Sequence, residues 1–312
     1  MREPGTTTHA RIPFEGRILA GTLHHPAGDA PYPAIIMLQG SGPDDRDSGG
    51  FFTPVRDWLI AAGFAVLSWD KQGVGGSTGD WRHQTIANRA EEARAALAWL
   101  RGQPAIDPGR IGLWGHSQGG WVAPLVAAQE PGVALLVIHS GTGLTPFAQD
   151  HVGMERTLRR DGGAEEDVAR GHAFLHELHV AAELAMPYDE MRDRLIVPAY
   201  GKPWLGYFGE VDPDLWQFFV LNAGEPLDPL WALRRVTCPT LAVFGERDVL
   251  IPVERSIEIL RETVGVRGVE LAIHVFPDAD HRLHLEDGSA FPPGYVDTMI
   301  GWMREQIDGA CA

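Results

Sequence analysis

The sequence predicts an α/β fold: a mostly parallel, doubly wound sheet that begins with an antiparallel hairpin and carries an inserted helical cap. Three observations predict it. Strand-like and helical patterns alternate over most of the chain, the apolar run at residues 34–38 indicates a strand covered on both faces, and the alternation stops between residues 145 and 235. The 312 residues, 44% of them hydrophobic, suffice for one large or two modest domains.

The elements follow in order along the chain. Residues 11–14 and 18–24 flank a short turn at Glu15-Gly16, which is typical of a β-hairpin. After the strand at 34–38, the pattern predicts helices at 55–62, 85–100 and 118–129, and strands at 64–69, 110–114 and 134–138. Beyond the interruption it predicts strands at 240–244 and 269–276 and helices at 252–264 and 295–307. Such alternation connects parallel strands through right-handed crossovers.

The interruption, residues 145–235, is the predicted cap, so the core is expected to comprise residues 1–144 and 236–312. Helical patterns cover 150–160, 165–185 and 188–196, and the rest, rich in Pro and aromatic residues, is predicted as loop. Trp204 and Trp216 are the candidates for an apolar substrate pocket under the cap. The alternative is that these aromatic side chains pack the cap onto the sheet.

Three cap histidines, His172, His176 and His179, share one helix face by their spacing, with Glu183 a turn further on. That spacing could hold a metal ion. A polar face of the cap, turned to solvent or to the mouth of a pocket, is the more common reason for such a pattern, and we expect no metal. The two cysteines of the chain give neither a ligand spacing nor a disulfide framework.

The charge of the chain is −16, from 42 acidic and 26 basic residues. An acidic surface repels phosphate backbones, so we expect no nucleic-acid partner. No apolar run is long enough for a membrane span, and the first twenty residues lack the apolar core of a signal peptide. The expectation is a soluble, cytoplasmic protein without a membrane partner.

The segment Gly115-His-Ser-Gln-Gly119 matches the pattern G-x-S-x-G between a predicted strand and a predicted helix. In that context the pattern indicates a nucleophile elbow, in which a tight turn exposes the serine hydroxyl above the edge of the sheet. The tight turn and the close packing of helix on strand require small residues at Gly115 and Gly119. Ser117 is therefore the candidate nucleophile.

A serine nucleophile needs a base, and the base needs an acid to orient it. Asp248 and His281 each follow a predicted strand, which places them at the same edge of the sheet as Ser117. Asp278 and Asp280 are alternative acids, although they lie very near His281 in sequence. The alternative base is His284.

The contexts GHSQGG, GERDVLIP and FPDADH, in this order, resemble the α/β-hydrolase superfamily over nearly the whole chain. Residues 38–47, LQGSGPDDRD, resemble the oxyanion loop of its bacterial carboxylesterase-like branch, whose members carry a helical insertion. The resemblance implies Ser117 as nucleophile, Asp248 as acid and His281 as base, with the backbone N–H groups of Ser41 and Gln118 forming the oxyanion hole. In the loop at 70–77, Gln72 stands where the superfamily has Arg, so an ion pair of that Arg is missing.

The predicted function is hydrolysis of carboxylic esters through an acyl-enzyme, with no cofactor. An acyltransferase or thioesterase using the same acyl-enzyme is the alternative, and a catalytically inactive binding protein is a third reading. A prolyl-oligopeptidase type is disfavoured because no propeller-sized N-terminal segment is present. The partner is expected to be a small, partly apolar ester. The acidic residues of cap and core favour neutral or cationic esters over polyanionic ones.

Overall fold

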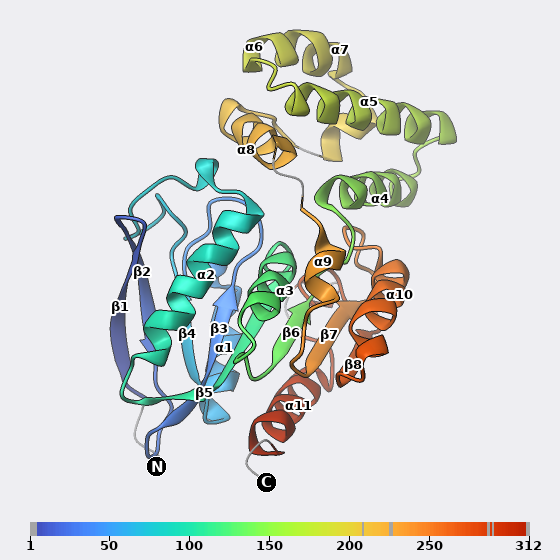
Figure 1. Ribbon diagram of the computed structural model, residues 1–312. Helices are drawn as coiled ribbons and strands as arrows, with labels where there is room; N and C mark the ends of the chain where they lie inside the picture. Colours follow the sequence, from blue (N-terminus) through green and yellow to red (C-terminus); the bar gives the residue numbers. More distant parts are fainter. Residues whose placement is uncertain (1–4, 208, 225–226, 286–287, 289, 310–312) are drawn as a thin grey trace.

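The computed structural model describes residues 5–207, 209–224, 227–285, 288 and 290–309 (Figure 1). Its described strands form one eight-stranded sheet in the order β1-β2-β4-β3-β5-β6-β7-β8. The strands are β1 Thr7–Phe14, β2 Arg17–His24, β3 Tyr32–Leu38, β4 Ala65–Trp69, β5 Ile106–His116, β6 Leu136–His139, β7 Thr240–Gly245 and β8 Leu271–Phe276. The predicted hairpin is confirmed as β1 and β2.

Strand directions agree with the predicted sheet. β1 pairs antiparallel with β2, and β2 pairs antiparallel with β4. The pairs from β4 through β3, β5, β6 and β7 to β8 are all parallel. β3, β4 and β7 are almost entirely buried, which explains their continuous apolar sequences. The parallel strands bring the ends of β5, β7 and β8 to one edge of the sheet, and the cap lies beyond that edge (Figure 1).

Helices cover both faces of the sheet, as a doubly wound fold requires. One face packs against α1 Phe52–Ala61 and α11 Tyr295–Gly309. The other face packs against α2 Ile86–Arg101, α3 Gly119–Gln129, α9 Pro229–Leu233 and α10 Val253–Thr263. The predicted helix at 85–100 begins one residue later, because Thr85 is its N-cap and forms a capping box with Asn88. Short helical turns complete the core: η1 Ser48–Gly50, η2 Trp81–His83 and η5 Gly265–Arg267.

The cap has an apolar core of its own, built from residues of α4, α5 and the segments after them. Its elements are α4 Pro146–Arg160, α5 Glu165–Glu183, α6 Tyr188–Met191, the π turn η3 Arg192–Ile196, α7 Val197–Ala199, η4 Pro203–Tyr207 and α8 Pro213–Gly224. The predicted loop after residue 196 is wrong over residues 213–224 and 229–233, where the chain forms α8 and α9. Asp212 and Asp228 accept hydrogen bonds from the first turns of these helices, and a proline follows each of them, which is a helix-start signal.

Cap and core are joined by contacts as well as by the chain. Arg82 of η2 pairs with Asp214 of α8 at 2.8 Å. The side chain of Asn222 on α8 accepts a hydrogen bond from the N–H of Ile86, at the start of α2, at 3.2 Å. Among the described helices, none combines the length and the apolar character that crossing a bilayer needs.

Candidate active site

Ser117 occupies the turn between β5 and α3, as the G-x-S-x-G pattern predicts. Its φ of +53° lies in the left-handed region, a strained conformation for a residue with a side chain. A Cβ added to Gly115 would lie 2.1 Å from the carbonyl oxygen of Gly119, and one added to Gly119 would lie 2.3 Å from that of Leu38. The turn therefore closes only with glycine at both positions.

The structure brings Ser117, His281 and Asp248 into one hydrogen-bonded chain. His281 Nε2 lies 2.9 Å from Ser117 Oγ, and His281 Nδ1 lies 2.8 Å from Asp248 Oδ2. The Asp248 side chain is fully buried. Its Oδ1 accepts hydrogen bonds from the N–H groups of Leu250 and Ile251 at 2.9 and 3.0 Å. Asp248 is thus held by the backbone while its second oxygen faces the imidazole.

The alternative residues lie elsewhere. Asp278 pairs with Arg247 at 2.6 Å, on the surface. Asp280 accepts hydrogen bonds from the N–H groups of Arg282 and His284 at 2.8 Å, and so shapes the loop that carries His281. The His284 ring packs edge-on against Phe291, with ring centroids 4.7 Å apart.

The predicted oxyanion loop passes directly over the serine. A Cβ on Gly40 would lie 3.9 Å from Ser117 Oγ, and the exposed Ser41 follows. Gln118 follows Ser117 and is buried at the start of α3. Ser41 therefore follows a residue that lies close to Ser117, and Gln118 is the next residue after Ser117. That their N–H groups form the oxyanion hole stays a prediction.

Two buried cations that the sequence analysis did not single out hold this loop. Arg89 of α2 donates to the carbonyl oxygens of Gly40 and Gln39, both at 3.1 Å, and to the side chain of Gln118. Lys71 Nζ donates to the carbonyl oxygens of Gly40 and, at 2.6 Å, of Gly42. Burial lowers the pKa of Lys71 and lowers that of Arg89 to about 10. Lys71 and Arg89 thus fix the loop backbone at three positions, Gln39, Gly40 and Gly42.

The loop at 70–77 shows what replaces the missing arginine. Gln72 donates a hydrogen bond to Glu92, a buried carboxyl on α2 whose pKa is raised by burial. The ion pair of this region is made instead by Asp70 with Arg46, which approaches at 2.6 Å from the oxyanion loop. Burial opposes the ionised form of Asp70, but the hydrogen bonds from Arg46 and Gly76 keep its pKa below the usual value.

Behind His281 lies a pair of buried histidines, His116 and His139. Their Nδ1 atoms are 3.1 Å apart, so one ring donates and the other accepts. Burial, reinforced by their neighbouring histidines, lowers the pKa of both, that of His139 to about 3. The ring of His116 lies 5.1 Å from that of His281, centroid to centroid. The low pKa values of His116 and His139 therefore favour uncharged rings next to His281.

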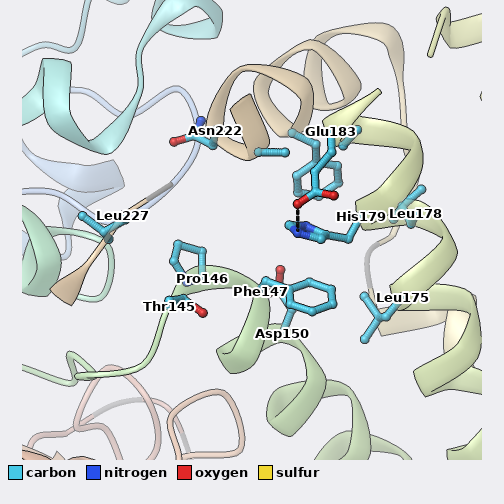
Figure 2. A pocket seen from close by; sticks show the side chains of 13 residues that line it. Thr145, Pro146, Phe147, Asp150, Leu175, Leu178, His179, Glu183, Asn222 and Leu227 are labelled. Atoms are coloured by element: carbon cyan, nitrogen blue, oxygen red, sulfur yellow. Dashed lines mark ion pairs between the residues drawn. The ribbon is translucent and has the colours of Figure 1, made fainter. Parts of the chain in front are cut away.

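The predicted pocket residues Trp204 and Trp216 lie in the apolar core of the cap, 7% and 3% exposed. Trp216 donates from Nε1 to the carbonyl oxygen of Met186 at 2.8 Å. A cavity of about 230 Å³ lies beside this core and is lined by other residues, among them Phe147 and Phe219 (Figure 2). The positions of both tryptophans therefore fit a packing role better than a place in a substrate pocket.

The cap histidines have separate surroundings. His172 contacts Glu155 and His151, His176 is exposed, and His179 pairs with Glu183 at 3.0 Å (Figure 2). Within the described part of the chain, no three His, Cys, Asp or Glu side chains are arranged to hold a metal ion.

Comparisons of the sequence extend this picture. The chain is 25% identical over 301 residues to esterase EstD of Thermotoga maritima, covering 91% of this chain and 65% of that protein. It is 33% identical over 144 residues to an uncharacterized protein of Mycobacterium tuberculosis, covering 45% of this chain and 49% of that protein. The chain thus spans less than two thirds of the length of these curated relatives.

Solved structures resemble the whole chain. An esterase of Pyrococcus furiosus is 18% identical with a TM-score of 0.62, covering 97% of this chain and 91% of its own. A proline iminopeptidase of Mycobacterium smegmatis has the same identity and TM-score, with 97% and 100% covered. These likenesses establish the α/β-hydrolase fold.

Residues 15–274 match the family described as X-Pro dipeptidyl-peptidase (S15 family). Because that match covers most of the chain, the protein belongs to the S15 family.

Proposed function

We propose that the protein hydrolyses carboxylic esters through an acyl-enzyme formed on Ser117. The observation that carries the proposal is the hydrogen-bonded chain from Ser117 through His281 to Asp248. A hydroxyl, an imidazole and a buried carboxylate in this geometry activate the oxygen as a nucleophile. The relationship to esterase EstD, over 91% of the chain, favours esters as substrates.

In the acylation step, Ser117 Oγ attacks the ester carbonyl carbon while its proton moves to His281 Nε2. Asp248 holds the ring with Nδ1–H toward itself and stabilises the imidazolium. The carbonyl oxygen becomes an oxyanion and accepts hydrogen bonds from the N–H groups of Ser41 and Gln118. The bond to the alcohol oxygen then breaks as His281 returns the proton to that oxygen, and the acyl group stays on Ser117.

In the deacylation step, water attacks the acyl carbon and gives a proton to His281. The second oxyanion collapses, the carboxylic acid leaves, and the proton returns to Ser117 Oγ. Each oxyanion donor contributes about 3 kcal/mol in enzymes of this kind. Lys71 and Arg89 act as positioning residues, because they bind the loop carbonyls rather than the substrate.

We also propose that residues 145–235 work as a lid over this site. Arg156 of α4 donates to the carbonyl oxygens of Asp248 and Ile251 at 3.3 and 3.0 Å, so the lid contacts the loop of the acid directly. A lid that covers the acyl-enzyme controls the access of water and of other acceptors. It thereby decides between hydrolysis and transfer to an alcohol, an amine or a thiol.

A fluorophosphonate probe and a substrate panel test the proposal. Wild-type protein should be labelled at Ser117, and Ser117→Ala should not. The panel holds p-nitrophenyl butyrate, a butyryl thioester and Ala-Pro p-nitroanilide, the last chosen because of the family name. We expect the p-nitrophenyl ester to be turned over fastest and Ser117→Ala to lose about 10³-fold or more in kcat/KM.

The controls separate the alternatives. His284→Gln, which changes the second histidine of the loop, should keep labelling and turnover. Faster cleavage of the p-nitroanilide would make the protein a peptidase, and product transfer to an added alcohol or amine that outruns hydrolysis would make it an acyltransferase. Folded wild-type protein that is neither labelled nor active would overturn the proposal in favour of a binding protein.

A further inference from the structure

The cavity in the cap is lined by residues from both ends of the cap and from its helices. Thr145 and Pro146 line it at the start of α4, Leu227 lines it just before α9, and Asn222 lines it from α8 (Figure 2). Asn222 also accepts the hydrogen bond from the first residue of α2 in the core. The cavity therefore lies at the base of the cap, on the side that faces the core.

The polar residues of the described lining are Thr145, Asn222, His179 and two acids. The acids are Asp150 of α4 and Glu183 of α5, and none of the described lining residues is Lys or Arg. Glu183 is paired with His179, whose ring stacks on Phe147 with centroids 4.0 Å apart. The remaining walls are largely apolar, with Leu175, Leu178 and Phe219 among them.

Asp150 is the unusual group. In the structure its carboxylate accepts one long hydrogen bond, from the hydroxyl of Tyr207 at 3.5 Å. Burial raises the pKa of Asp150 to about 7, an effect that the Tyr207 hydrogen bond only partly opposes. A carboxyl in an apolar cavity with so little stabilisation is much more costly to ionise than one in water. A cation in the cavity would stabilise the ionised form.

The position of Asp150 relates the cavity to the proposed active site. Asp150 and Arg156 lie on the same helix, six residues or about 9 Å apart along its axis, and Arg156 contacts the loop of Asp248. The pKa of the Tyr207 hydroxyl is raised by burial first, then by the nearby charge of Asp150 and then by that of Asp248. Tyr207 is therefore close enough to interact electrostatically with both carboxylates. A volume of about 230 Å³ is below that of typical whole-ligand pockets, so the cavity suits one arm of a substrate.

We propose that this cavity binds a cationic alkylammonium arm of the ester substrate, with Asp150 as the carboxylate that meets the positive charge. The inference rests on the proposed function, since it names the substrate class of that site. Phe147 and Phe219 supply apolar and aromatic surface around the arm. Glu183 supplies a second, weaker negative charge because it is half exposed and already paired with His179.

Matched ester pairs test the inference. On the alcohol side, butyrylcholine is compared with 3,3-dimethylbutyl butyrate, in which a tert-butyl group replaces the trimethylammonium group. On the acyl side, the p-nitrophenyl ester of 6-(trimethylammonio)hexanoate is compared with that of 7,7-dimethyloctanoate. We expect wild type to favour the cation by about tenfold in kcat/KM in at least one pair, a difference of about 1.4 kcal/mol.

Variants assign that preference to the cavity. Asp150→Asn, which keeps the shape of the side chain, should bring the cation-to-neutral ratio of kcat/KM close to one. Glu177→Gln removes an exposed charge from α5 and should keep the full preference. If Asp150→Asn does not fold, Glu183→Gln must lower the ratio partially. Ratios near one in wild type for both pairs, or a preference that persists in Asp150→Asn, would overturn the inference.

A binding measurement separates this inference from the proposed function. Calorimetry on Ser117→Ala with butyltrimethylammonium should give a Kd at least tenfold lower than on Ser117→Ala/Asp150→Asn. Binding without any ester turnover in wild type would leave the cation site standing while the esterase proposal fails. Turnover of neutral esters without cation binding would do the opposite.

Discussion

The loop beside Ser117 and the cavity at the base of the cap contain ionisable side chains of opposite type. Lys71 and Arg89 place two cations on the carbonyl side of the loop, whereas Asp150 places a carboxyl in a cavity whose described lining contains neither Lys nor Arg. Lys71 and Arg89 each donate at least two hydrogen bonds to protein oxygens, whereas the described structure gives the Asp150 carboxyl one long hydrogen bond. A charged group with several protein partners fixes a structure, and a group with few partners is suited to a ligand.

The two regions also differ in what holds them together. The core loop is braced by backbone carbonyls, glycines and buried polar groups that allow little movement. In the cap, α4 and α5 meet through the apolar core and through the exposed ion pair Arg159–Glu165. Exposed pairs contribute only about 0–1 kcal/mol each. We therefore expect the loop beside Ser117 to be held more firmly than the helices around the cavity.

The largest expected effect concerns Asp248, the proposed acid of the triad in the core. Asp248→Asn removes the charge that orients His281 and should lower kcat by about 10³-fold or more while the fold persists. Asp278→Asn is the matched control, because it changes the alternative acid, which pairs with Arg247 on the surface. Steady-state kinetics on the p-nitrophenyl ester measures both. A larger loss from Asp278→Asn would remove Asp248 from the proposed triad.

The next effect tests whether the buried cations fix the loop. Lys71→Met removes the hydrogen bonds to Gly40 and Gly42 and should lower kcat by about 10²-fold with little change in KM. Lys202→Met changes the only other lysine of the chain, which is exposed on the cap, and should leave both constants unchanged. If Lys71→Met raises KM and spares kcat, Lys71 contacts substrate and the comparison fails.

A third effect bears on the stability of the cap. Trp216→Ala should lower the free energy of unfolding by about 3–5 kcal/mol, because it removes a buried side chain from the cap core. The ratio of kcat/KM for short and bulky esters should stay constant, since Trp216 lies outside the lining of the cavity. Trp231→Ala, at a partly exposed site, is the control for a milder loss. Thermal unfolding and the ester series check these outcomes, and a changed ratio in folded protein would return Trp216 to the pocket.

The last effect is a pH dependence of stability. Because the pKa of Asp150 is raised to about 7 in the folded state, the folded protein keeps a proton that the unfolded chain releases near pH 4. The stability of wild type should therefore fall relative to Asp150→Asn as pH rises from about 4 to 7 and then level off. Melting temperatures of the two proteins between pH 5 and 8 measure this difference. A constant difference across that range would show that Asp150 is ionised throughout.

The parts of the site that were predictable from sequence are those set by local pattern. A strand, a Gly-x-Ser-x-Gly turn and a helix place Ser117, and the ends of later strands place Asp248 and His281 near it. Lys71 and Arg89 were not predictable, because their partners are carbonyl groups of a loop about 30 to 50 residues away. No sequence pattern marks a contact between a side chain and a distant backbone group.

The cap was less predictable for a physical reason. Aromatic residues satisfy a core and a pocket equally well, so Trp204 and Trp216 could not be assigned by composition. Phe147 lies just before the predicted helix at 150–160, and Asp150 is its first residue. Neither residue stands in a sequence pattern that marks a cavity. Helix α8 was missed because Pro213 was interpreted as a loop residue, although Asp212 before it marks a helix start.

The contact between Arg156 and the loop of Asp248 has a consequence for how such proteins can be recombined. A single guanidinium joins the inserted segment to the acid loop through two carbonyl oxygens and also pairs with Glu254 at the start of α10 at 2.9 Å. A chimaera that exchanges residues 145–235 for another insertion therefore also replaces a support of the acid. Such a graft needs an arginine at the position of Arg156, or the acid loop must be transplanted with it. The boundary of the exchangeable unit is thus set by this contact, not by where the chain leaves and re-enters the sheet.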